Sequence, residues 1–327
     1  MDLSLAVQNL VSPPVLFFAL GVFAALVRSE LAIPQAVAKG MSLYLMLAIG
    51  FKGGVAAIGH GLGLDLLLVI IAATALSFAI PLVAFFFLKT TTKLDQINMA
   101  AIAAHYGSIS IVTFIAATAA LELSGIEYPG IMIAAAAAME APAIATALFL
   151  AHRGRKKQEE QGAPADNSML WREVALNASV VLLVGAFLIG MATGEKGYKE
   201  ISPFITAPFK GVLCLFLLDM GLVAGRELRQ VRKTLTPALL GFGIYMPPIG
   251  AVIGGLTGAL IGLDTGGIML LSVLAASASY IAVPAAMRIA LPEAKPSLYL
   301  TLSLAITFPF NLTIGIPAYI SLAEALS

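Results

Sequence analysis

The feature that most constrains this chain is a series of long apolar stretches separated by short polar ones. Ten segments approach the roughly 20 apolar residues that a helix needs to cross a bilayer. Of the 327 residues, only 11% are charged, whereas soluble domains carry about 25%. The sequence therefore predicts an all-α integral membrane protein. The expected spans are residues 13–27, 34–51, 64–88, 96–120, 130–151, 172–192, 202–224, 236–261, 266–287 and 297–320.

Basic residues are distributed unevenly between the loops. The loops that follow odd-numbered spans carry Arg28, Lys89, Lys93, Arg153, Arg155, Lys156, Lys157, Arg172, Arg226, Arg229, Arg232, Lys233, Arg288 and Lys295. The opposite loops carry only Lys52, Lys196 and Lys199. Because positive loops stay in the cytoplasm, we expect a multi-pass protein with both termini outside.

One polar stretch divides the chain into halves of five spans each. It contains "HRGRKKQEEQGAPADN", residues 152–167, and is typical of a solvated cytoplasmic linker. It serves either as a spacer that enforces orientation or as a dock for a soluble regulator. The expected organisation is a first repeat at 1–151, a linker at 152–171 and a second repeat at 172–327.

The two halves carry a faint internal repeat. A shift of 171 positions aligns "AVAKGMSLYLMLAIGFKGG" (36–54) with "APFKGVLCLFLLDMGLVAG" (207–225), and also places Ser108 on Ser279. Because five is an odd number of spans, the second copy enters the membrane from the opposite side. The sequence thus predicts two inverted five-helix repeats, the design of many secondary transporters.

Two predicted spans contain residues that interrupt a helix. The fourth carries "AHYGSIS" (104–110), and the ninth carries "AASASYIAVP" (275–284). Glycine weakens a helix, proline removes a backbone donor, and serine competes for backbone hydrogen bonds. Irregular backbone is tolerated inside a membrane only where protein or a wet cavity surrounds it. We therefore expect two broken helices that cross at mid-membrane.

Crossed half-helices can bind ions of both signs. The start of a half-helix exposes unpaired N–H groups and a partial positive charge, which suit a small anion. The carbonyl end, with Ser, Thr and Asn oxygens, suits sodium. An anion beside a cation reduces the cost of burying either ion, so the pattern favours their coupled uptake.

The sequence resembles the SbtA family of sodium-dependent bicarbonate transporters. The similarity covers essentially the whole chain and includes "AIAAHYGSISIVTFIAATAALE", "MEAPAIATAL" and "ASASYIAVPAAMRIALPEAKPSLYLTLSLAITFPFNLTIGIP". It implies sodium-driven bicarbonate symport across the plasma (inner) membrane by an elevator-type alternating-access mechanism. It further implies core and gate domains, a homotrimer and a PII-like regulator, SbtB. It also implies that the bicarbonate cradle is formed by Gly107, Ser108, Ser110, Ser277, Ala278 and Ser279.

Several polar residues outside the cradle are candidates for ion binding. Glu140 and Asn311, each beside a proline, could complete a sodium site or hold helices together. Thr113 and Thr307 are further sodium candidates. His105 could transfer protons, but a structural hydrogen bond is the more ordinary role. We expect sodium as the only metal and coupling ion, and no other cofactor.

Two further features have simpler expected roles. Asp219 lies near Arg226 and is expected to form a salt bridge with it. The glycines at 250, 254, 258 and 262 recur every four residues and would form one smooth helix face for close packing.

Other functions remain open at this level. The alternatives are a sodium/proton exchanger, a symporter of another small anion, a passive channel and an intramembrane enzyme. Exchangers usually need an aspartate at the crossing, and neither break contains one. No metal-binding or paired-aspartate motif points to catalysis, so we expect no enzyme and no catalytic residues. A net charge of +1 gives no indication of a nucleic-acid partner.

Overall fold

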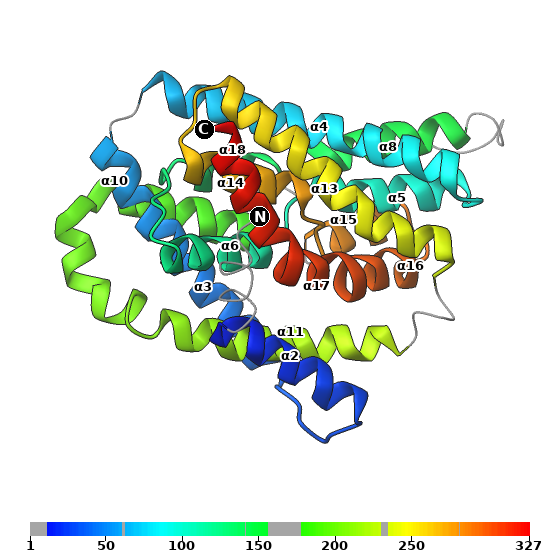
Figure 1. Ribbon diagram of the computed structural model, residues 1–327, viewed down its shortest axis with the longest axis horizontal. Coiled ribbons are helices and arrows are strands. Elements are labelled where there is room, and N and C mark those ends of the chain that lie inside the picture. Colours follow the sequence, from blue (N-terminus) through cyan, green and yellow to red (C-terminus); the bar gives the residue numbers. More distant parts are fainter. Residues whose placement is uncertain (1–11, 61–62, 141, 156–177, 230–234, 281) are drawn as a thin grey trace.

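A computed structural model describes residues 12–60, 63–140, 142–155, 178–229, 235–280 and 282–327, and every regular element in these ranges is helical (Figure 1). The all-α prediction is confirmed for these ranges. Residues 156–171 of the expected linker and the first residues of the second repeat lie outside them. The helices of the first half are α2 (Pro13–Leu26), α3 (Gln35–His60), α4 (Leu64–Thr91), α5 (Gln96–Gly107), α6 (Ile111–Leu123), α7 (Met132–Ala138) and α8 (Pro142–Arg155).

The second half begins with two long helices and ends in a series of short segments. Its elements are α10 (Ala178–Ile205), α11 (Phe209–Leu228), α13 (Pro237–Leu260), α14 (Thr265–Ala276), α15 (Ala282–Ala290), α16 (Pro296–Thr301), the π-helix η1 (Leu302–Thr307), α17 (Phe308–Phe310), the π-helix η2 (Asn311–Gly315) and α18 (Ile316–Leu326). Each of the ten expected spans overlaps one or more of these helices.

Five helical stretches in the described ranges are long and apolar enough to cross a membrane when short breaks are included. They are Leu64–Thr91, Gln96–Leu123, Met132–Ala151, Pro237–Leu260 and Pro296–Leu326. A sixth candidate is the pair formed by α10 and α11, which meet at a bend of 52°. These lengths fit a multi-pass membrane protein, while ten crossings in an inverted arrangement stay a prediction.

The ends of two helices differ from expectation. The apolar run predicts that α3 stops near residue 51, but the helix continues to His60, so Lys52 lies inside a helix and not in a loop. The sixth span is expected to end at residue 192. The helix there, α10, instead bends at Gly194, where φ is 55°, and continues to Ile205. Glycine adopts this left-handed conformation without the steric penalty of other residues, so the chain can bend there.

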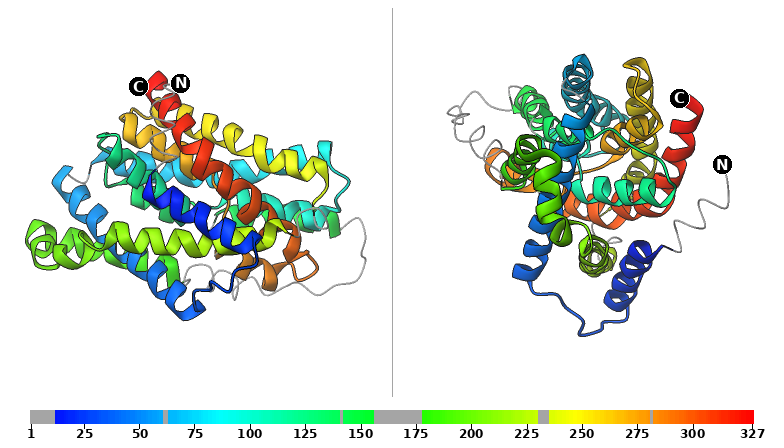
Figure 2. Two further views of the ribbon diagram at one scale, coloured as in Figure 1. Left: turned by 60° about the horizontal axis from the view of Figure 1, so that its bottom comes forward. Right: turned by 90° about the vertical axis from the view of Figure 1, so that its left-hand side faces the viewer.

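The helices pack as two groups. The flanking group consists of α2, α3, α10 and α11, in which α3 packs along α10 and α2 along α11. Both views in Figure 2 keep α2 beside α11. The central group contains α4 to α8 and α13 to α18, and its helices contact one another more than they contact the flanking group. In Figure 1 the central group lies above α2 and α11.

Small residues make the closest helix pairs possible. A side chain at Gly21 would meet the Leu218 carbonyl of α11, and one at Gly54 would meet the Phe187 carbonyl of α10. Such contacts let two backbones approach closely, which favours helix association where the surroundings are apolar. Close backbone packing at these glycines therefore determines which helices of the flanking group pair with each other.

The expected glycine face of α13 is confirmed at three positions and wrong at one. Gly250, Gly254 and Gly258 lie against the backbone of α14. Gly262 follows the end of α13 and has a φ of 76°, so it terminates the helix and does not extend its smooth face.

Candidate functional site

The first break separates α5 from α6. Asp95 begins α5 by accepting a hydrogen bond from the Asn98 backbone, and the helix ends twelve residues later at Gly107. Partial burial pushes the pKa of Asp95 upward, but hydrogen bonds from Asn98 outweigh it, and the pKa lies below its usual value. After Gly107 the chain is extended, and Ser110 then begins α6 by accepting a hydrogen bond from the Thr113 backbone at 3.2 Å.

Gly107 is fixed at this point by its neighbours. A side chain at this position would overlap the ring of Pro81 in α4 and crowd Ala143 in α8. Because Pro81 is rigid and inside a helix, it could not move away. The break therefore sits in a tight gap between α4 and α8.

The second break repeats this design. Asp264 caps α14 through the Gly267 N–H at 2.7 Å, the helix again has twelve residues, and α15 starts at Ala282. By helix ends, Ser108 corresponds to Ser277 and Ser110 to Ser279, each pair lying 169 positions apart. The shift of 171 that places Ser108 on Ser279 is therefore wrong here, since helix ends, not scattered identities, define the register.

The two breaks are joined by hydrogen bonds. The Ser279 N–H donates to the His105 carbonyl at 2.7 Å. The Ser110 N–H donates to the Ser277 hydroxyl at 2.9 Å, and that hydroxyl donates to the Leu274 carbonyl at 3.0 Å. The prediction that the fourth and ninth spans break, and that their breaks face each other, is confirmed.

These bonds make the two halves of the crossing unequal. On one side an N–H reaches a carbonyl directly, while on the other the Ser277 hydroxyl lies between them. The Ser108 hydroxyl, which corresponds to that of Ser277, is fully buried and has no hydrogen-bond partner among the described residues. Ser108 therefore carries a free hydroxyl at the crossing.

Three other buried side-chain atoms share this property in the described part of the chain: His105 Nε2, the Tyr280 hydroxyl and Ser303 Oγ. His105 stacks on Tyr299 with ring centroids 4.3 Å apart, and its Nδ1 lies 2.6 Å from the Ala101 carbonyl. A carbonyl only accepts, so Nδ1 carries the proton in this contact, and Nε2 of the neutral ring is an acceptor. This arrangement is the structural role expected of His105.

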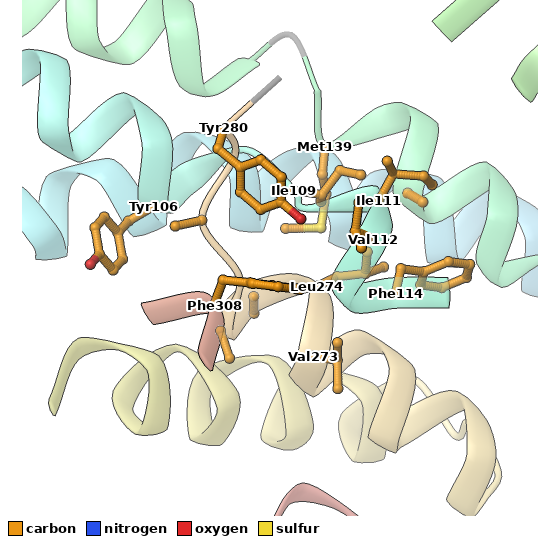
Figure 3. Close-up of a cluster of buried hydrophobic side chains, with 14 of the residues drawn as sticks. Tyr106, Ile109, Ile111, Val112, Phe114, Met139, Val273, Leu274, Tyr280 and Phe308 are labelled. Atoms are coloured by element: carbon orange, nitrogen blue, oxygen red, sulfur yellow. The ribbon is translucent and has the colours of Figure 1, made fainter. Parts of the chain in front are cut away.

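Apolar side chains surround the crossing on several sides. Figure 3 shows Ile109, Ile111, Val112, Met139 and Phe308 around the region between the two breaks. All five are buried. An ion held here would be shielded from water, and each hydrogen bond to it would be strengthened by the low local dielectric.

A third break, which the sequence analysis missed, adjoins the crossing. Helix α7 ends at Ala138 and α8 begins at Pro142. The Ser77 hydroxyl of α4 connects the two ends, since it donates to the Met139 carbonyl at 2.8 Å and accepts from the Ala143 N–H at 3.1 Å. Pro142 was the signal, because proline commonly starts a new helix.

Glu140 lies in this third break. It is 8% exposed, and it forms no ion pair with any described residue. The structure thus places a buried carboxylate one break away from the crossing, and its role as a sodium ligand stays a prediction.

The other sodium candidates already have protein partners. Asn311 donates to the Ala276 carbonyl and accepts from the Tyr319 hydroxyl, both at 2.9 Å. These two bonds give it the helix-bridging role. The Thr307 hydroxyl donates to the Gly243 carbonyl at 3.0 Å and also contacts the Tyr106 hydroxyl.

Thr113 lies at the start of α6, where its hydroxyl donates to Ser110 Oγ at 2.9 Å. Threonine oxygens that donate one bond still have a lone pair for a cation. Thr113, Thr307 and Asn311 each hydrogen-bond to a residue at or beside a break, but their assignment to sodium stays a prediction.

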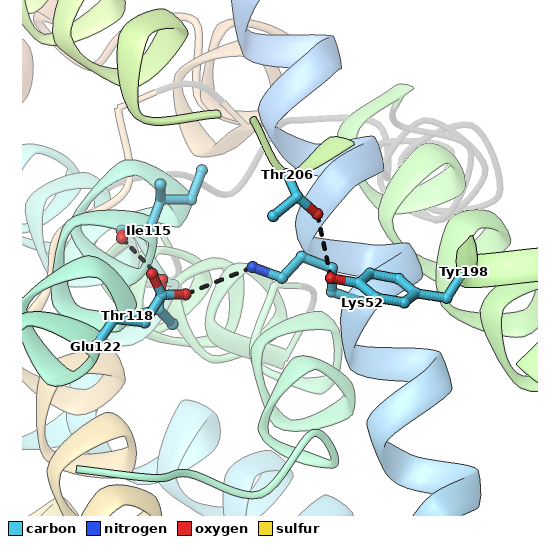
Figure 4. Close-up of polar contacts among 6 residues, drawn as sticks. All are labelled: Lys52, Ile115, Thr118, Glu122, Tyr198 and Thr206. Atoms are coloured by element: carbon cyan, nitrogen blue, oxygen red, sulfur yellow. Dashed lines mark hydrogen bonds and ion pairs between the residues drawn. The ribbon is translucent and has the colours of Figure 1, made fainter. Parts of the chain in front are cut away.

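The expected salt bridge between Asp219 and Arg226 does not form. In the described ranges the one ion pair joins Lys52 of α3 to Glu122 of α6 at 3.4 Å (Figure 4). Because Lys52 lies inside α3, it can cross from the flanking group to the central group. Asp219 is buried within α11, and its carboxylate is too far from Arg226 to pair with it.

Interrupted helices that meet around buried polar groups, in an apolar all-helical protein, define the architecture of secondary transporters. A comparison with models of protein families identifies one superfamily of such transporters. Residues 13–324 match the model of the Na+-dependent bicarbonate transporter superfamily, and the chain belongs to that superfamily. The resemblance inferred from the sequence is thereby confirmed. No curated protein matches the chain.

Proposed function

We propose that the protein imports bicarbonate together with sodium and that the anion binds where the breaks of α5–α6 and α14–α15 meet. The observation that carries this proposal is the buried, unpartnered hydroxyl of Ser108 at the crossing. A buried hydroxyl without a partner is unfavourable by about 1–3 kcal/mol, so a bound ligand that accepts its hydrogen bond would remove that cost.

The start of α6 supports an anion. Its first two backbone N–H groups, at Ile111 and Val112, have no hydrogen-bond acceptor among the described residues. With the partial positive charge of a helix N-terminus they form a favourable environment for a small anion. Bicarbonate is planar, carries one charge and has three oxygens that accept N–H and O–H donors.

The residue types at the breaks favour a monovalent anion. Neither 104–110 nor 275–284 contains Arg or Lys, which would normally form two-pronged contacts with sulfate or a dicarboxylate. Hydroxyls and backbone N–H groups are sufficient for a single charge.

Sodium would bind beside the anion. The proposed ligands are Glu140, Thr113, Thr307 and Asn311, whose oxygens are of the type that hard cations prefer. A cation next to bicarbonate would offset the cost of burying one ion alone, which is at least about 2.5–3.5 kcal/mol. This cost explains why the two ions would move together.

The two helix groups suggest how transport proceeds. In our proposal the central group is the moving core of an elevator, because it contains both breaks, and the flanking group is the gate through which a homotrimer assembles. Both termini face the outside of the plasma (inner) membrane, and a PII-like protein such as SbtB regulates transport from the cytoplasm. The protein acts as a carrier and not as an enzyme.

The proposal is tested by uptake of labelled bicarbonate into proteoliposomes under a sodium or a potassium gradient. We expect uptake only with sodium, and strong loss of uptake in Ser108→Ala and Ser279→Ala. Ser272→Ala is the matched control, because that buried hydroxyl already donates to the Ile268 carbonyl of its own helix at 2.9 Å. Equal uptake in potassium, or normal uptake in both test variants, would contradict the proposal.

The same vesicles separate the alternatives. Competition by an excess of unlabelled nitrate or formate would indicate a symporter of another small anion. Proton release on addition of sodium without bicarbonate would indicate a sodium/proton exchanger.

A further inference from the structure

We propose that the Tyr280 hydroxyl is a direct ligand of the transported anion and that, together with Ser110, it completes the anion site at the N-terminus of α6. The inference rests on the proposed function, and it adds a side chain that neither the repeat nor the break pattern indicates. Tyr280 lies in the second break, between α14 and α15, whereas α6 follows the first break. The ligand would therefore be held by both halves of the chain.

The position of Tyr280 is defined by its ring. The ring packs edge-on against Phe308 with centroids 5.5 Å apart, and the residue is 9% exposed. Figure 3 shows the hydroxyl pointing away from Phe308, toward Ile109, Ile111 and Met139. Packing alone would be satisfied by phenylalanine at this position, so the oxygen needs its own explanation.

The hydroxyl has no hydrogen-bond partner among the described residues. It lies beside the Ser110 side chain but does not meet it with hydrogen-bond geometry. Side chains of Ile, Val and Met around it offer no oxygen or nitrogen. A tyrosine buried in this way usually finds a partner for its O–H, and a bound ligand would supply one.

Ser110 supplies a second unused donor at the same place. Its oxygen accepts from the Thr113 backbone at 3.2 Å and from the Thr113 hydroxyl at 2.9 Å. Both lone pairs are thereby engaged, so the remaining capacity of Ser110 is its own O–H. Two hydroxyl protons thus lie next to each other at the beginning of a 13-residue helix.

A convergence of donors selects the charge of the ligand. The N–H groups of Ile111 and Val112 add to the two hydroxyls, and the helix end contributes a partial positive charge. A cation would meet protons from every side, whereas an oxyanion would accept from several of them. A ligand held by these donors is therefore a small oxyanion, which in the proposed function is bicarbonate.

The test is Tyr280→Phe in the full-length protein, reconstituted in liposomes with labelled bicarbonate and a sodium gradient. We expect the KM for bicarbonate to rise about tenfold, because a hydrogen bond to a charged group is lost, with a change of about 1.4 kcal/mol. The sodium concentration for half-maximal uptake, measured at saturating bicarbonate, should stay the same. The matched control is Tyr44→Phe, which removes a hydroxyl that donates to the Phe204 carbonyl at 2.6 Å, outside the central group.

The outcomes distinguish this inference from the function on which it rests. If the unmodified protein takes up no bicarbonate, the proposed function fails and the inference with it. If the unmodified protein transports bicarbonate and Tyr280→Phe leaves its KM unchanged, only the inference is overturned. Should the phenylalanine variant fold poorly, Tyr280→Met supplies a second hydroxyl-free variant. Bicarbonate-dependent thermal stabilisation of that variant in detergent should then require about tenfold more ligand.

Discussion

The two corresponding serines at the crossing should respond differently to the same mutation. Ser277 accepts from the Ser110 N–H and donates to the Leu274 carbonyl, which also accepts from the Ser277 backbone N–H at 3.4 Å. Ser277→Ala therefore leaves one buried backbone group, the Ser110 N–H, without its partner. A buried group without a partner costs about 1–3 kcal/mol, so the variant should lose about 2 kcal/mol of unfolding free energy. That loss corresponds to roughly a 30-fold change in the folding equilibrium.

Ser108→Ala removes a buried hydroxyl that hydrogen-bonds to no described residue. Since no protein hydrogen bond is lost, the free energy of unfolding should stay the same or rise slightly, while the affinity for bicarbonate falls. Denaturant titration in detergent measures the stability of both variants, and bicarbonate-dependent thermal shifts measure the affinity. Equal stability losses in the two variants would show that the inequality between the two breaks is not real.

Three other changes test separate features of the structure. Gly107→Ala should abolish stable folding, because the new methyl group overlaps the ring of Pro81, and size-exclusion chromatography in detergent would detect a normal, monodisperse protein if that is wrong. Asp95 has a folded-state pKa below its unfolded value of about 3.9, because the first turn of α5 donates hydrogen bonds to it and outweighs the effect of partial burial. Its contribution to stability is therefore complete above that unfolded value and disappears as the pH falls through the lower folded pKa. Asp95→Asn should therefore show a smaller loss of stability than the unmodified protein as the pH falls below about 4. Lys52→Met should change the maximum uptake rate by at most about fivefold without changing the KM, and combining it with Glu122→Gln should have no further effect, because a partly exposed ion pair contributes about 0–1 kcal/mol.

Much of the helical layout could be predicted because membrane burial leaves a strong signal. Apolar run lengths located the helices, and Gly107 with its neighbouring serines marked the break that ends α5. The same reasoning located the break after α14. The apolar pattern did not show how far a helix continues beyond its apolar run. For example, α3 extends past its expected end at residue 51 to His60.

The finer features depend on contacts that a linear pattern does not encode. The break before Pro142 is held open by Ser77, a residue 65 positions earlier in an unremarkable apolar helix. Likewise, the Ser277 hydroxyl accepts from the Ser110 N–H, and these two residues are 167 positions apart in the sequence. Identities among Gly, Ala and Leu are common by chance in membrane helices, and this explains why a shift of 171 misaligned the serines by two positions.

The Ser77 hydroxyl, which ties together the ends of α7 and α8, has a mechanical consequence. A gap in a helix is ordinarily a hinge, but this one is fastened on both sides to the same atom of α4. Met139 and Ala143, which flank Glu140, are therefore both held to α4, so a displacement of α4 would carry this break and Glu140 with it.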